Sequence, residues 1–118
     1  MSQLKKYNLD RIKAFVGEDK EMLNKMVGIF LDNGPQMLLT IHDSLLTKDY
    51  KKLAFQAHKL KTSIDHFSIE TLTSEIRLIE KYGNEKTNLE LLPSLVQKLE
   101  LELRETMDEI KADFNISD

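Results

Sequence analysis

Apolar residues recur along most of the chain at steps of three or four, the spacing that places side chains on one face of an α-helix. One such stripe consists of Leu53, Ala57, Leu60, Ile64 and Phe67. Three other stripes follow the same rule: Leu23, Val27, Phe30, Gly34, Leu38, Ile41 and Leu45; Ile69, Leu72, Ile76 and Ile79; and Leu92, Val96, Leu99, Leu103, Met107, Ile110 and Phe114. No segment shows the strict alternation of a β-strand. The pattern therefore predicts an all-α protein.

Capping residues and glycines mark the ends of the first two helices. A short helix is predicted over residues 10–16, with Asn8 as its N-cap and Gly17 ending it. A long helix is predicted over residues 20–46, although it contains Pro35. Its stripe keeps the same phase on both sides of Gly34, so we predict one helix kinked at Pro35. Two helices that meet at Gly34 are the alternative.

Similar signals place the other three helices. The helix with the Leu53 stripe is expected over about residues 49–66, with Asp49 opening it. Ser68 is predicted to cap the following helix, and Gly83-Asn84 to stop it. The last helix is predicted from about residue 89 to about residue 114, with Pro93 in its first turn, where the missing amide hydrogen costs nothing.

These elements favour one architecture. Four amphipathic helices with short connections pack most simply as an antiparallel up-down four-helix bundle. The short N-terminal helix is expected to cap one end of the bundle with Leu9, Ile12, Phe15 and Val16. Because 118 residues suit one domain, residues 1–118 are expected to form a single domain.

Composition excludes several function classes. The chain has no cysteine, so it has neither disulfides nor thiolate chemistry. Its net charge of −3, with mixed signs, argues against general nucleic-acid binding. No stretch approaches the roughly 20 apolar residues of a membrane span. The N-terminal lysines Lys5 and Lys6 are not followed by the apolar core of a secretion signal. A cytoplasmic, membrane-free protein is therefore expected.

The helix over residues 49–66 carries a candidate reactive residue. If the stripe is centred between Ala57 and Leu60, His58 points about 140° away from it, toward water. Lys61, one turn further on, projects from the same side. Thr62 and Asp65 lie close by, and the small Ala54 leaves room above the ring. An exposed imidazole beside an ammonium group suits phosphoryl acceptance, although most surface histidines have no such role.

The run Ala57-His58-Lys59-Leu60-Lys61-Thr62-Ser63, followed by Phe67, Leu72 and the pair Ile79-Glu80, resembles the histidine-containing phosphotransfer (HPt) domain family. The family motif has an alanine-histidine pair, a basic residue, an apolar residue, then lysine, glycine and serine. Thr62 takes the place of the usual glycine, and Ser68 stands where glycine is common before the fourth helix. Thr62 could narrow partner choice, slow transfer or donate a hydrogen bond to the phosphoryl group.

The resemblance implies a phosphorelay carrier in two-component signal transduction. His58 would accept a phosphoryl group from the aspartate of one receiver domain, in a hybrid histidine kinase, and pass it to the receiver of a response regulator. Lys61 would neutralise that group, and the receiver would supply the Mg²⁺, so the chain needs no cofactor of its own. Partner contacts are expected from Lys51, Ala54, Lys59, Thr62 and Asp65, with Lys52 extending the basic side of the helix. Leu31, Met37 and Met26 are candidate apolar contacts, with the alternative that they simply widen the core stripe. A monomer is expected.

Other readings remain open or are disfavoured. A helical adaptor that binds a partner without chemistry would have the same fold. His42, expected to pack at the core boundary, and His66, expected at a helix end, do not share a metal-binding spacing with His58, so no metal site is predicted. The chain has no nucleotide-binding motif and no nucleophile elbow, and it is too short to add an ATP-binding domain to a kinase dimerisation domain. Its initial methionine favours a free-standing protein over a fragment of a hybrid kinase.

Overall fold

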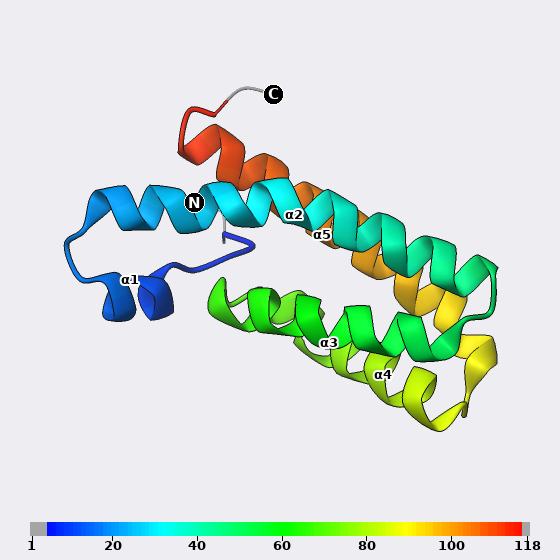
Figure 1. Cartoon of the computed structure of the whole chain (residues 1–118). Coiled ribbons are helices and arrows are strands. Elements are labelled where there is room, and N and C mark those ends of the chain that lie inside the picture. Colours follow the sequence, from blue (N-terminus) through cyan, green and yellow to red (C-terminus); the bar gives the residue numbers. More distant parts are fainter. Residues whose placement is uncertain (1–4, 117–118) are drawn as a thin grey trace.

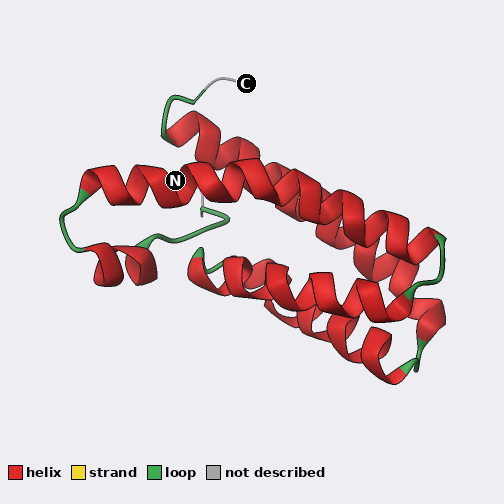
Figure 2. Ribbon diagram, viewed as in Figure 1, coloured by secondary structure: helices red, strands yellow, loops and turns green. Residues whose placement is uncertain are grey.

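The computed structural model describes residues 5–116, and this part of the chain contains helices and loops but no strand. The helices are α1 (Asp10–Val16), α2 (Lys20–Leu46), α3 (Tyr50–His66), α4 (Thr73–Glu85) and α5 (Leu92–Asp113). Short 3-10 turns, Glu70–Leu72 and Leu89–Leu91, lead into α4 and α5. The all-α class predicted from the stripes is therefore confirmed (Figure 2).

The four long helices pack as neighbours around one core. α2 lies against α3 and α5, and α4 also lies against α3 and α5. Figure 1 shows α2 and α5 on one side of the molecule and α3 with α4 on the other. The predicted stripes meet in the middle, where Leu38, Leu60, Ile76 and Leu99 are almost completely buried. The rings of Phe30 and Phe67 stack with centroids 4.4 Å apart and join α2 to the end of α3.

α2 is one continuous helix of 27 residues, so the alternative of two helices meeting at Gly34 is wrong. Its first turn is capped by Asp19, whose side chain accepts a hydrogen bond of 3.0 Å from the backbone amide of Met22. Gly34 is buried, and a Cβ atom there would lie 2.6 Å from the Sδ atom of Met107 on α5. The glycine therefore allows the two helices to approach closely and does not form a turn.

The N-terminal arm and α1 are held against the ends of the bundle. The backbone amide of Asn8 donates to the carbonyl oxygen of Phe67 over 2.8 Å, and the Lys6 ammonium pairs with Glu102 of α5 at 3.1 Å. Ile12 is buried as predicted, and Leu9 and Val16 are half-buried. Phe15, by contrast, is 81% exposed, because the two-turn α1 buries only the side that carries Ile12. The prediction that Phe15 covers the bundle end is wrong.

Two capping predictions are corrected by the backbone. Ser68 does not cap α4: it lies just past the end of α3 with a φ of 50°. The amide of Ser68 donates to Asp65, and that of Ile69 donates to Ile64, which is the hydrogen-bond pattern of a Schellman motif. Asn8 does accept from a helix amide, that of Asp10, but the N-cap position itself belongs to Leu9.

Gly83-Asn84 does not stop α4, which continues to Glu85 and ends where Lys86 takes a left-handed φ of 54°. Gly83 is buried inside the helix, beside Ala54 of α3. Its lack of a side chain therefore serves the contact between the two helices, a requirement that the sequence pattern of α4 alone does not reveal.

Candidate functional site

α3 presents His58 to solvent because of the rotation set by its buried residues. Leu53, Ala57, Leu60 and Ile64 all lie in the core. A side chain that follows Ala57 by one residue turns about 100° away from that face. The His58 side chain accordingly remains 61% exposed, as the apolar stripe predicts.

The exposed imidazole is held by a carboxylate of the neighbouring helix. The Nδ1 atom of His58 lies 2.7 Å from the Oε2 atom of Glu80 on α4. The other carboxylate oxygen of Glu80, Oε1, lies 2.9 Å from the Nζ atom of Lys61. One carboxylate therefore links the histidine and the lysine, and this links α3 to α4 at the surface.

Charge fixes the ionisation of this carboxylate. Partial burial of Glu80 acts to raise its pKa, but the hydrogen bonds from Lys61 and His58 outweigh burial and lower the pKa below its ordinary value. Glu80 is therefore ionised at neutral pH. An ionised carboxylate can only accept hydrogen bonds, so the hydrogen on a neutral His58 ring belongs on Nδ1.

This arrangement determines which ring nitrogen can react. With Nδ1–H donated to Glu80, the Nε2 atom of His58 keeps its lone pair. The site can therefore offer Nε2 as a nucleophile to an electrophile that approaches from solvent.

The other residues expected to contact a partner fall into two groups. Lys51, Lys59 and Thr62 are exposed on α3, so all three are accessible to a partner. Ala54 is 1% exposed, because it packs against α4 at Gly83, so it offers a partner very little surface. Asp65 is half-buried, and its carboxylate pairs with Arg77 at 2.9 Å. Asp65 is therefore already neutralised within the chain, which a pattern on α3 alone does not indicate.

A surface hollow of about 570 Å³ borders the histidine between α3 and α4. Its lining consists of Asp49, Lys51, Lys52, Ala54, Phe55, His58, Glu80 and Asn84. Ala54 forms its buried floor, and Phe55 stands on its rim with 61% exposure. The hollow gives another molecule space to approach the imidazole from the side of α4.

Glu80 is one of the residues that resemble the HPt family, but it was not predicted to belong to the site. Phe55 was not predicted as a site residue. Glu80 adjoins Ile79 of the α4 stripe, so it lies at the edge of the buried face. That position was a signal that Glu80 could meet a residue of a neighbouring helix. The sequence does not show which residue Glu80 contacts, because that depends on how α3 and α4 pack.

The candidate apolar contacts of α2 and the histidines other than His58 differ in exposure. Leu31 is buried, so its prediction as an apolar partner contact is wrong, whereas Met26 and Met37 are half-buried. His42 is not a packing residue: it is exposed, and its Nδ1 atom lies 3.0 Å from Glu100 on α5. His66 is the last residue of α3 and is exposed. Over residues 5–116, no group of three or more potential ligands is arranged to hold a metal ion.

Comparison with known families now identifies the chain. The model of the Hpt domain family matches residues 25–113, which include all of α3, α4 and α5 and the part of α2 from Lys25 onward. The chain belongs to the Hpt domain family. Membership of this family implies histidine phosphotransfer in a phosphorelay, with receiver domains as partners. No curated protein and no solved structure matches the chain.

The Hpt match leaves the N-terminal arm and α1 outside it, since it begins within α2. Within the part of the chain that the structure describes, no helix is both long and apolar enough to cross a membrane.

Proposed function

We propose that His58 is the residue of this Hpt domain that carries the phosphoryl group between two receiver domains. The observation that carries the proposal is the contact between His58 Nδ1 and Glu80, at 2.7 Å, on a ring whose side chain is 61% exposed. This contact leaves the outward Nε2 atom as the free nucleophile. The antiparallel up-down order of the four long helices, predicted from the sequence, is the arrangement in which α3 and α4 form such a hairpin.

The transfer needs no proton to leave the ring. The Nε2 lone pair attacks the phosphorus of the receiver's phosphoaspartate, the N–P bond forms, and the bond between phosphorus and the aspartate oxygen breaks. The aspartate carboxylate departs with the electron pair. The phosphorylated ring keeps its Nδ1–H and gains positive charge, which the ionised Glu80 stabilises. The reverse reaction delivers the group to a second receiver.

Lys61 supports this chemistry through charge. Its side chain is 25% exposed and its ammonium pairs with Glu80, so it holds the carboxylate that orients His58. It also adds positive potential near the phosphoryl oxygens, the role expected from its spacing of three from His58. Lys61 is therefore proposed as both a positioning and a neutralising residue.

We infer that the receiver supplies the remaining parts of the reaction, namely the aspartate and a bound Mg²⁺. The Hpt chain contributes no ATP-binding or hydrolytic site and acts as a monomeric intermediate in the cytoplasm. Its docking face comprises the exposed side of α3, with Lys51, Lys59 and Thr62, and the adjoining part of α2. Exposed Ile29 and half-buried Met26 and Met37 of α2 line a shallow hollow together with Ser63 and His66 of α3, so we propose these three as the apolar contacts in place of Leu31.

The test is chemical. Purified protein is incubated with receiver domains that carry a labelled phosphoryl group, and acid-labile, alkali-stable label on the chain is measured. We expect label on wild type and its loss, by at least about 100-fold, in His58→Gln, because glutamine has no nucleophilic ring nitrogen. Label that persists in His58→Gln would place the chemistry on another residue.

His42→Gln is the matched control. His42 is also exposed and also directs Nδ1 toward a carboxylate, that of Glu100 at 3.0 Å. We expect this variant to be labelled as wild type is. Absence of label on wild type with a broad panel of receivers would instead favour a helical adaptor without chemistry.

A further inference from the structure

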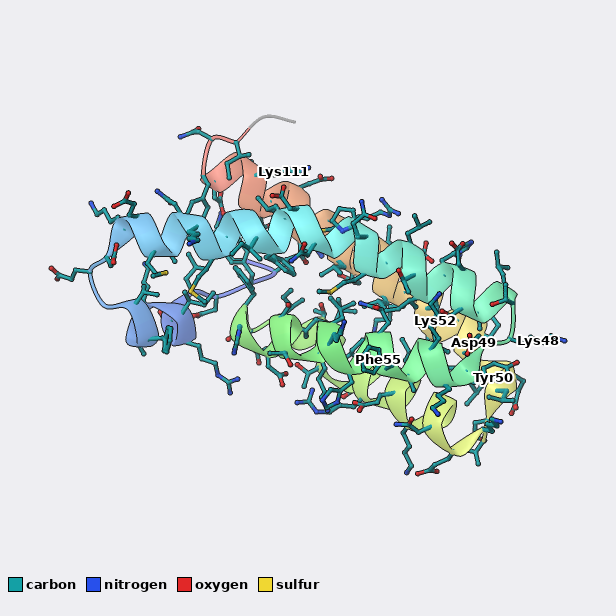
Figure 3. The ribbon with its side chains drawn as sticks, viewed as in Figure 1. Lys48, Asp49, Tyr50, Lys52, Phe55 and Lys111 are labelled. Atoms are coloured by element: carbon teal, nitrogen blue, oxygen red, sulfur yellow. The ribbon has the colours of Figure 1, made fainter. Side chains whose placement is uncertain are left out.

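An aromatic ring stands exposed on α3 one turn before the histidine. Phe55 is 61% exposed, and no exposed phenylalanine other than Phe15 occurs among the described residues. Phe30 and Phe67, in contrast, stack in the core. Phe55 and His58 are three residues apart on one helix, so they project from neighbouring positions on its surface. Figure 3 shows Phe55 on α3, with Lys52 on the same helix and Lys48 and Asp49 where the helix begins.

The Phe55 ring is partly ordered before any partner arrives. The Nζ atom of Lys59 lies over it, 4.8 Å from the ring centroid, in a cation–π contact. Because the two residues are four apart, the contact forms within α3 itself. A partner that packs on the ring therefore loses less side-chain entropy than it would against a freely rotating phenyl group.

Phe55 and His58 line the same hollow. Ala54 forms its floor, Glu80 and Asn84 contribute from α4, and Lys51 and Lys52 stand at the α3 side. An apolar side chain entering here would pack on the exposed Phe55 ring, beside the imidazole of His58. The hollow is thus continuous with the site proposed for phosphoryl transfer.

The charges around Phe55 determine which kind of partner surface can bind in the hollow. Lys51, Lys52 and Lys59 surround Phe55 on the exposed side of α3, while Glu80 is already paired with His58 and Lys61. Asp49 is an acidic residue of the lining, and its carboxylate caps α3 by accepting from the amide of Lys52 at 3.2 Å. The free charge around the ring is therefore basic, and it favours a partner surface with carboxylates around an apolar residue.

We propose that Phe55 is a specificity-determining contact for the receiver domain: an apolar side chain beside the receiver's acidic site packs on the Phe55 ring in this hollow, and Lys51 and Lys52 pair with its carboxylates. This proposal depends on the phosphotransfer function proposed above. Phe55 acts in docking alone, so it should affect how tightly the receiver binds and not how fast the bound pair reacts.

The experiment measures single-turnover transfer from receiver domains phosphorylated with acetyl phosphate. From a panel of purified receivers, the one that labels wild type fastest is chosen, and the rate is recorded over a range of Hpt concentrations. For Phe55→Ala we expect the half-saturating concentration to rise about 10-fold, which corresponds to 1.4 kcal/mol, with a limiting rate within about two-fold of wild type. Phe55→Leu should recover part of the loss, because it restores apolar contact.

Leu101→Ala is the matched control, since Leu101 on α5 is 60% exposed and lies away from the hollow lining. It should leave both parameters unchanged. The proposal is overturned if Phe55→Ala shifts half-saturation no more than Leu101→Ala does, or if it lowers the limiting rate instead.

A partner-free reaction separates this proposal from the proposed function. Phosphoramidate, a small phosphoryl donor, should label His58 equally in wild type and Phe55→Ala. If wild type accepts label from receivers and the Phe55→Ala half-saturation is normal, only the docking role fails. If wild type accepts no label from any receiver, the phosphotransfer function fails and the docking role fails with it.

Discussion

Gly83 of α4 lies directly against Ala54 of α3, so that a Cβ atom on Gly83 would be 3.1 Å from the Ala54 Cβ atom and 3.1 Å from the backbone oxygen of Tyr50. Glu80 precedes Gly83 by one turn of α4, and His58 follows Ala54 by one turn of α3. The contact between these two small residues, Gly83 and Ala54, therefore sets the distance between the two helices where the His58–Glu80 hydrogen bond forms. A backbone feature with no chemistry of its own controls the geometry of the proposed site.

Gly83→Ala should destabilise the protein. Alanine is ordinarily better than glycine inside a helix by about 1 kcal/mol, but overpacking against a backbone oxygen costs about 1–3 kcal/mol. We expect a net loss of about 1 kcal/mol in the free energy of unfolding, measured by urea denaturation, and a longer His58–Glu80 contact. Gly28→Ala on α2 is the control, because nothing lies within 4 Å of its Cβ position, and it should stabilise the protein. Equal effects of the two substitutions would contradict this account.

The stability conferred by Glu80 should depend on pH. Its pKa is lowered in the folded protein, because the hydrogen bonds from Lys61 and His58 outweigh burial. A lowered folded pKa means that the stabilisation is present above the unfolded pKa and is lost as the pH falls through the folded pKa. The difference in unfolding free energy between wild type and Glu80→Gln should therefore shrink as the pH falls from about 5.5 to about 2.5.

The control for this pH dependence removes the partner that lowers the pKa of Glu80 most, the Lys61 ammonium. In a Lys61→Met background, the effect of Glu80→Gln should change much less over the same pH range. An unchanged pH profile in that background would show that the Lys61 hydrogen bond does not lower the pKa.

Ser68→Gly should stabilise the protein by about 1 kcal/mol. Ser68 has a φ of 50°, a left-handed conformation that costs an L-residue about 1–2 kcal/mol and that glycine adopts freely. The measurement is thermal or urea unfolding. Ser74→Gly, within α4, is the matched substitution at a helical position, and it should destabilise by about 0.5 kcal/mol. The same sign for both substitutions would rule out the backbone explanation.

Thr62→Gly should speed phosphoryl transfer from a receiver. Thr62 is exposed one turn from His58, and its branched side chain narrows the approach to the ring. We expect the single-turnover rate at low Hpt concentration to rise several-fold. Thr62→Ser and Thr62→Val distinguish the other role: if the hydroxyl group donates to the phosphoryl group, valine would slow transfer and serine would preserve it.

Much of the fold could be predicted from periodicity because a helix's buried stripe is a local property. The stripe of α2 kept one phase across Gly34 and Pro35, and the structure has a single helix there. The wrong predictions are those in which the role of a residue depends on a neighbouring element. Gly83 lies inside α4, where it makes room for α3, and does not end the helix. Ser68 belongs to the end of α3 instead of the start of α4. Phe15 was misplaced because α1 buries only one side.

For the site, the sequence by itself determined that His58 faces solvent with Lys61 one turn away, since both facts follow from the rotation of one helix about its buried residues. Only the tertiary structure decided that Glu80 bridges His58 and Lys61, that Asp65 forms an ion pair with Arg77, and that Phe55 lines the same hollow as the imidazole. The physical reason is that these contacts join α3 to α4, and the separation and rotation of two packed helices depend on the small residues at their interface, Ala54 and Gly83.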